Sequence, residues 1–310
     1  FDRLTGTVEW YNRKTTDLLL EYPMAISLGF PGYYANVGSI VNRGFDITLG
    51  ADIISTRDWR WNVTVMGSTL KNKVLKLTDN GEDIVNGVYI IREGQEINTF
   101  YMSKSAGVDP TTGEQLYWAY EKNADGSMKP GSEYVINDAT VAAGCKYLQG
   151  SRIPDIYGSI SSSLKFRGFD LGLLFTYSLG GKIYDSIYNA MMEPSFVGQT
   201  YHRNALRTWT APGQRTDVPR TTTTASTQIT DRYLVDASYF AVKNISLGYS
   251  LPKGVLGKVG IESLRVYLSA DSPWIFTHLK GMNPQASFTG STSYSYTPNR
   301  TFTLGVDLKF

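Results

Sequence analysis

The last eleven residues, Arg300–Phe310, read RTFTLGVDLKF. Apolar and polar residues alternate without interruption, which predicts a β-strand with one apolar and one polar face. The apolar face would carry Phe302, Leu304, Val306, Leu308 and Phe310. Such a strand occurs either half-buried in a water-soluble β-domain or in the wall of an outer-membrane barrel. The remaining segments decide between these two interpretations.

Composition excludes several classes of protein. The 310 residues include 30 Lys plus Arg against 28 Asp plus Glu, and a net charge of +2 is not the electrostatic pattern of a nucleic-acid binder. No apolar run approaches the roughly 18 residues of a membrane helix. One cysteine and two separated histidines exclude an intramolecular disulfide framework and a Cys-rich zinc site. We therefore expect an all-β protein without metal or cofactor.

The alternation of the last strand recurs along the chain. It is present in residues 2–20, 45–53, 59–65, 156–166, 169–175, 245–251 and 264–270. Residues 97–107 and 114–121 flank the turn sequence DPTTG and are expected to form a further hairpin. Lys243 breaks the alternation, so the apolar face of its strand is expected to begin at Ile245. The count is about ten strands, as in part of a large barrel.

The connections between these strands differ regularly in length. Short turns fall near residues 55, 111, 167 and 256, and long loops fall near 25, 85, 140, 210 and 285. Short and long connections alternate, as expected when one end of each strand faces the periplasm and the other faces the cell exterior. Aromatic residues gather at both strand ends, where interfacial girdles form. They are Trp59, Trp61, Phe166, Phe169, Tyr249 and Phe310 near short turns, and Trp10, Tyr177 and Trp274 near long loops. The sequence predicts an antiparallel transmembrane β-barrel with long extracellular loops.

Five stretches spread over the chain resemble the C-terminal region of the SusC/RagA family, the TonB-dependent outer-membrane transporters of Bacteroidetes. They are Ala35–Ile53, Gly150–Asp185, Ala205–Arg220, Tyr233–Pro252 and Pro298–Phe310. One departure is AYEKNADGSM (Ala119–Met128), which stands where family members often carry an Asp-rich loop. With so few carboxylates, calcium binding is not expected there.

The resemblance implies a barrel of about 22 strands with an N-terminal plug. It implies active import of a glycan or peptide nutrient. The expected partners are a SusD-like surface lipoprotein and the TonB–ExbB–ExbD complex. The resemblance is also compatible with a dimer of transporter–lipoprotein pairs. Residues 1–310 would supply about ten C-terminal strands, in contact with outer-membrane lipid. The plug, the TonB box and the earlier strands are expected outside this chain. The terminal aromatic residue Phe310 would be part of the signal read by the barrel-assembly machinery.

The sequence has no G-x-S-x-G, P-loop or H-E-x-x-H pattern, each of which would indicate a catalytic site. We therefore expect that the protein is not an enzyme. His202 and His278 are expected to be surface or packing residues, and Cys145 an incidental thiol.

Contact with cargo is expected from loop aromatics, because rings stack on the C–H faces of sugars. The candidates are Tyr188, Tyr201, Trp209, Phe288, Tyr294 and Tyr296. The alternative is that these rings pack the loops against each other or against the lipoprotein. Charged residues on the polar strand face would hold the plug. They are Asp46, Asp52, Arg60, Asp170 and Arg265.

Two other functions remain open at this point. The chain could belong to an adhesive β-protein that binds glycans at the surface without moving them, or to a passive porin.

Overall fold

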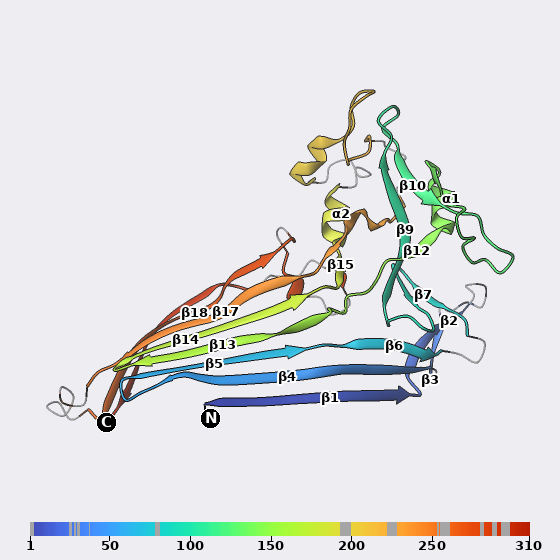
Figure 1. Cartoon of the computed structure of the whole chain (residues 1–310). Helices are drawn as coiled ribbons and strands as arrows, with labels where there is room; N and C mark the ends of the chain where they lie inside the picture. Colours follow the sequence, from blue (N-terminus) through green and yellow to red (C-terminus); the bar gives the residue numbers. More distant parts are fainter. Residues whose placement is uncertain are drawn as a thin grey trace.

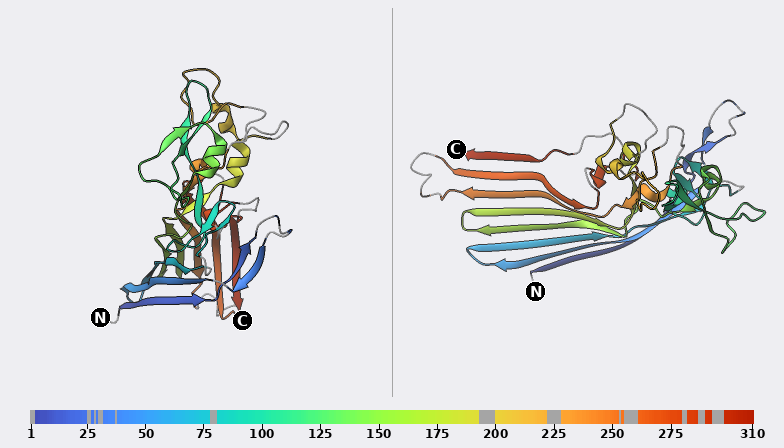
Figure 2. Two further views of the ribbon diagram at one scale, coloured as in Figure 1. Left: turned by 90° about the vertical axis from the view of Figure 1, so that its right-hand side faces the viewer. Right: turned by 90° about the horizontal axis from the view of Figure 1, so that it is seen from above.

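The computed structural model places long β-strands side by side, with a layer of loops, short strands and short helices at one end (Figures 1 and 2). The structure describes residues 3–24, 27, 29, 32–36, 38–77, 81–192, 200–221, 228–252, 254, 261–279, 282–286, 290–292 and 298–310. No helix within these residues is both long and apolar enough to cross a membrane.

The long strands form one antiparallel sheet of nine strands. In sheet order the path runs β1 (Leu4–Thr16), β4 (Ser39–Ser55), β5 (Trp59–Ser68), β13 (Ile156–Phe166), β14 (Phe169–Leu179), β17 (Tyr239–Ser250), β18 (Ser263–Thr277) and β19 (Thr301–Lys309). The ninth strand, β6 (Lys71–Lys76), pairs with the first residues of β4. Neighbouring strands on the path follow one another in the chain, as in an up-and-down barrel wall.

The register aligns apolar residues into continuous rows across the sheet. Leu171 pairs with Leu247, Leu247 with Leu268, and Leu268 with Leu304. The last three side chains are 48%, 56% and 71% exposed. Exposure of a continuous row of leucines to water is unfavourable. Such a row is normal on the outer surface of a barrel, where it contacts lipid. This face is called the lipid face below, and the opposite face the polar face.

Aromatic side chains mark both ends of the lipid face. At the short-turn end Trp59 stacks on Phe166 with ring centroids 4.0 Å apart, and Phe169 lies 4.5 Å from Tyr249. Toward the long loops, Tyr177 lies on the same face of β14 as Phe169. The eight steps from Phe169 to Tyr177 span about 26 Å at about 3.3 Å per residue, the scale of the apolar band between two aromatic girdles.

The C-terminal strand has the predicted structure. It pairs with β18 through Leu304–Leu268 and Leu308–Leu264 on the lipid face. Phe310 follows β19 directly, is 84% exposed, and lies at the short-turn end of the sheet beside the Glu262–Lys309 ion pair. An exposed terminal ring at this end fits the periplasmic rim of a barrel.

The prediction that the hairpin around residues 97–121 belongs to the wall is wrong. Residues 97–121 form β9 (Thr99–Val108) and β10 (Gln115–Ala119), which belong to a separate six-stranded sheet at the loop end. Its other strands are β7 (Ile84–Asn86), β8 (Tyr89–Ile91), β11 (Tyr134–Ile136) and β12 (Lys146–Leu148). On β9 both faces are covered, because Phe100, Met102, Thr99 and Ser103 are all buried. The alternation of short and long connections survives, since everything between β6 and β13 is a single long connection.

The remaining short elements also lie in the long connections. Two of them are α2 (Ser186–Met192) and the 3₁₀ helix η2 (Arg203–Arg207). The others are β2 (Leu19–Pro23), β3 (Gly32–Asn36), α1 (Ala139–Gly144), β15 (Lys182–Tyr184), η3 (Asp231–Tyr233), β16 (Leu234–Asp236) and η4 (Pro284–Ala286). The largest apolar cluster of the loop layer joins Phe100 and Met102 of β9 to Tyr184, Met192, Val218 and Tyr233.

Candidate functional site

The five charged residues expected to face a plug all lie on the polar face of the sheet. Their register partners are polar residues or glycine: Asp46 pairs with Glu9, Asp52 with Asn62, and Arg60 with Lys165. Asn62 donates from Nδ2 to Asp52 Oδ1 at 3.0 Å. In a barrel this face lines the lumen. Contact of these residues with a plug stays a prediction.

Asp170 and Arg265 neutralise each other near the short-turn end. The Arg265 guanidinium donates through Nε and Nη2 to the two carboxylate oxygens of Asp170, at 3.0 and 2.7 Å. It also donates through Nη1 to Asp307 Oδ2 at 3.3 Å. The Asp170–Arg265 ion pair spans β17 at Gly248. A Cβ at Gly248 would come within 2.6 Å of the guanidinium. This three-residue ladder ties β14, β18 and β19 together with bidentate geometry. Asp307 was not among the residues predicted to face the plug, although the alternation of the last strand places it on the polar face.

Two of the candidate cargo-binding rings have packing contacts. Tyr188, on α2, lies edge-on to His202 and Tyr233, and its hydroxyl accepts from Asn204 Nδ2 at 2.7 Å. Trp209 donates from Nε1 to the Pro110 carbonyl at 3.0 Å. A Cβ at Gly113 would come within 2.4 Å of its ring. Both rings therefore hold the loop layer together, as the alternative interpretation proposed, and their contact with cargo stays a prediction.

The other candidate rings divide into two groups. Tyr201 is partly exposed on the loop layer, just before η2. Phe288, Tyr294 and Tyr296 lie outside the described residues.

Two of the long connections are joined by a clasp, defined here as Tyr184–Ser186 with Gly290–Thr292. The Tyr184 N–H donates to the Gly290 carbonyl at 2.6 Å, and the Thr292 N–H donates to the Tyr184 carbonyl at 3.1 Å. The Ser186 hydroxyl donates to the Thr292 carbonyl. Asp185 is buried beneath these bonds and accepts from the Tyr188 N–H at 2.9 Å. Burial raises the pKa of Asp185, opposed by its bonds from Tyr188 and Thr292 and by the nearby His202.

The clasp should therefore depend on pH. Because the folded state holds the Asp185 proton more tightly than the unfolded chain, clasp stability is greatest below the unfolded-state pKa and falls as pH rises through the raised pKa. Asp185→Asn keeps the Oδ1 acceptor without the charge, so at neutral pH we expect higher amide-exchange protection at Tyr188. Asp236→Asn is the control, and its expected effect on local stability at neutral pH has the opposite sign. Hydrogen bonds from Ser238 lower the pKa of Asp236, so loss of this charge should reduce local stability. Lower protection in Asp185→Asn at neutral pH would contradict this account.

The turn η4 folds onto the polar face of the sheet. Gln285 accepts from Lys243 Nζ at 2.8 Å and donates from Nε2 to Thr176 Oγ1 of β14 at 3.4 Å. Arg152 donates from Nη2 to the Pro284 carbonyl at 2.7 Å. Lys243 occupies the β-bulge between β17 and β18, so the predicted break in alternation at this residue is confirmed. The bulge turns Lys243 toward the polar face, a common use of bulges next to functional sites.

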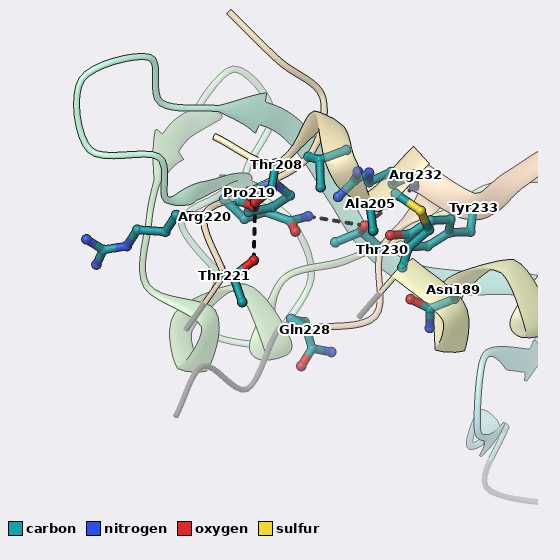
Figure 3. Close-up of a pocket in the computed structure, with 13 residues that line it drawn as sticks. Asn189, Ala205, Thr208, Pro219, Arg220, Thr221, Gln228, Thr230, Arg232 and Tyr233 are labelled. Atoms are coloured by element: carbon teal, nitrogen blue, oxygen red, sulfur yellow. Dashed lines mark hydrogen bonds between the residues drawn. The ribbon is translucent and has the colours of Figure 1, made fainter. Parts of the chain in front are cut away.

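A small cavity lies inside the loop layer (Figure 3). Its volume is about 40 Å³, which has room for little more than water. Its walls include Thr208, whose hydroxyl donates to the Pro219 carbonyl, and Gln115, which donates to Thr230 at 3.4 Å. This cavity is too small for cargo.

The described part of the chain holds no group of three or more His, Cys, Asp or Glu side chains that could bind a metal ion. Cys145 is buried against Ala119 and Tyr120. His202 caps η2, since its Nδ1 accepts from the Asn204 N–H at 3.1 Å. In the hairpin at residues 119–128 the Asp125 carboxylate accepts from the Ser127 N–H and hydroxyl, at 2.9 and 2.6 Å. These polar residues have structural roles.

Comparison with known proteins shows that the chain is similar to part of several TonB-dependent receptors. No family model matches. Over its whole length the chain is 28% identical to TonB-dependent receptor P3 of Formosa agariphila, and over 99% of its length it is 25% identical to TonB-dependent receptor SusC of Bacteroides thetaiotaomicron. The solved structure of the RagAB peptide transporter superposes on the whole chain with a TM-score of 0.87 at 27% identity. The chain spans 32% of the Formosa receptor, 30% of SusC and 34% of the RagAB chain.

Proposed function

Because the chain belongs to the SusC/RagA family of TonB-dependent receptors, we propose that the complete protein actively imports a glycan or peptide nutrient across the outer membrane. The observation that carries this proposal is the superposition of the whole chain on a peptide transporter with a TM-score of 0.87. The two-faced sheet supports it independently, because exposed leucine rows on one face and the Asp170–Arg265–Asp307 ladder on the other suit lipid outside and water inside. The sheet is part of the wall of an outer-membrane β-barrel.

The chain covers about a third of its relatives, so several features of the complete protein are proposed from the family. We place residues 1–310 in the C-terminal part of the barrel domain, with the plug, the TonB box and the earlier strands before them. The free edges of β1 and β19 would pair with those earlier strands, because unpaired backbone groups are costly in lipid. Asp46, Asp52 and Arg60 face the lumen and would contact the plug.

Partners are proposed on the same basis. The RagAB and SusC relatives support a SusD-like surface lipoprotein over the loop layer, and the TonB–ExbB–ExbD complex would act on the absent N-terminal region. The role requires binding and translocation without covalent chemistry, so we propose no enzymatic activity.

An uptake experiment tests the proposal. A strain that lacks the complete gene should lose growth on one glycan or peptide from a panel of sole carbon sources, and wild-type cells should stop taking up that labelled compound when an uncoupler collapses the proton gradient. Uptake that continues without the gradient would indicate the passive porin. Surface binding without any uptake would indicate the adhesive protein.

A further inference from the structure

Two cations converge on the turn η4 without a negative partner. Lys243 donates to the side-chain oxygen of Gln285, and Arg152 donates to the carbonyl of Pro284, the preceding residue. Both acceptors are neutral. Among the described residues no carboxylate lies within ion-pair distance of either cation. The whole connection 278–300 contains no Asp or Glu but includes Lys280 and Arg300.

Arg152 is the more desolvated of these two cations. Its Nε is buried and has no hydrogen-bond partner in the described structure. Burial lowers the pKa of Arg152, and of the other described groups only the Tyr239 hydroxyl acts in the opposite direction. A buried guanidinium without a counter-charge is unfavourable. Arg152 does not line the cavity described next, but it adds uncompensated positive charge at the turn η4, which forms part of the cavity wall.

An open cavity of about 370 Å³ lies beside this turn, between the loop-side half of β18 and residues 298–300. Its polar lining consists of two cations, two amides and two hydroxyls. These are Lys243, Arg300, Asn283, Gln285, Ser272 and Thr277. No described residue forms a hydrogen bond or ion pair with the Arg300 side chain. Asp271, which precedes the lining residue Ser272 in the chain, accepts from Asn244 Nδ2 at 2.7 Å and is not part of the lining.

We propose that this cavity binds a carboxylate group of an acidic oligosaccharide built from uronic-acid units, an assignment that rests on the proposed import function and narrows its cargo. Lys243 and Arg300 supply the charge, and charge-assisted hydrogen bonds to carboxylates are among the stronger polar contacts. The amide and hydroxyl side chains each donate and accept, which matches sugar hydroxyls. The bulge at Lys243 sets the lysine toward the cavity at the extracellular end of the lumen, on the path of entering cargo.

A binding experiment on the purified complete transporter tests this site without energised uptake. Calorimetric titration should give tighter binding of an oligogalacturonate than of a neutral galacto-oligosaccharide of equal length, with affinity that falls as salt is added. The double variant Lys243→Gln with Arg300→Gln should weaken binding of the acidic probe at least about tenfold, since hydrogen bonds to charged groups contribute about 1.5–3 kcal/mol each. Lys243→Arg keeps the charge and should keep most of the affinity.

Lys165→Gln is the matched control, because it removes a lysine from the polar face at the opposite end of the sheet. It should leave binding of both probes unchanged. The proposal fails if the wild-type protein does not prefer the acidic oligosaccharide, if Lys165→Gln causes the same loss, or if an oligoglutamate binds more tightly than the oligogalacturonate. Because these readouts are binding constants, they separate failure of this site from failure of the import function.

Discussion

Replacing Leu247 with Arg should sharply reduce the amount of folded protein in the outer membrane, whereas the same change at the preceding residue, Ser246→Arg, should be tolerated. Leu247 lies in the row Leu171–Leu247–Leu268–Leu304 on the lipid face, and Ser246 pairs with Ser269 on the polar face. An Arg on the lipid face at the bilayer midplane costs about 2–4 kcal/mol. On the polar face the guanidinium stays in water.

The measurement is the yield of the complete protein that migrates as a folded barrel in unheated gel samples of the outer-membrane fraction. The two variants add the same charge one residue apart, so differences in expression or net charge cannot explain a difference in yield. Equal yields would show that this side of β17 does not contact lipid.

The second large effect is expected from Gly158→Ala, which should prevent correct pairing of β13 with β5. Gly158 lies opposite both Tyr177 and Gly67 in the register. A Cβ at Gly158 would come within 2.0 Å of the Met66 carbonyl oxygen and 2.8 Å of the Tyr177 hydroxyl. That hydroxyl donates to the same carbonyl at 2.9 Å, so the methyl group would disrupt a cross-strand bond as well. The backbone of Met66 cannot yield as a side-chain tip can, and we expect a loss of about 3 kcal/mol or more.

Gly172→Ala is the matched control on the next strand. There the nearest atom to a new Cβ is the Cβ of Ser246 at 3.8 Å, an ordinary contact. Thermal unfolding followed by the shift from folded to unfolded gel mobility should show a lower midpoint for Gly158→Ala and little change for Gly172→Ala. A second variant, Tyr177→Phe, separates the lost hydrogen bond from the steric clash. If Gly158→Ala matches the control, the close approach at Gly158 does not limit stability.

Much of the wall was visible in the sequence. Strands such as 169–175 and 264–270 carry their two faces in local alternation, and the break at Lys243 correctly located a bulge. The hairpin around Asp109–Gly113 was assigned to the wall wrongly. Its turn sequence indicates a hairpin anywhere in a protein, and only the burial of both faces of β9 places it in the loop layer.

The candidate site was harder to foresee because its contacts join distant parts of the chain. Arg265 meets Asp170 across 95 residues, and Arg152 meets Pro284 across 132. From the sequence, Trp209 was expected to be a ring in a long loop that contacts cargo. In the structure it packs on Gly113 and donates a hydrogen bond to the Pro110 carbonyl. No local pattern encodes such contacts.

The sequence by itself determined the two-faced strands, the alternation of short and long connections, and the aromatic ends of the wall. These follow from local chemistry, because side chains alternate along any strand and each must suit lipid or water. Only the tertiary structure decided which strands enter the wall, that Arg265 joins Asp170 to Asp307, and that Lys243 and Arg152 meet at η4. Those pairings depend on how long connections fold over the end of the sheet, where packing between distant segments outweighs local preference.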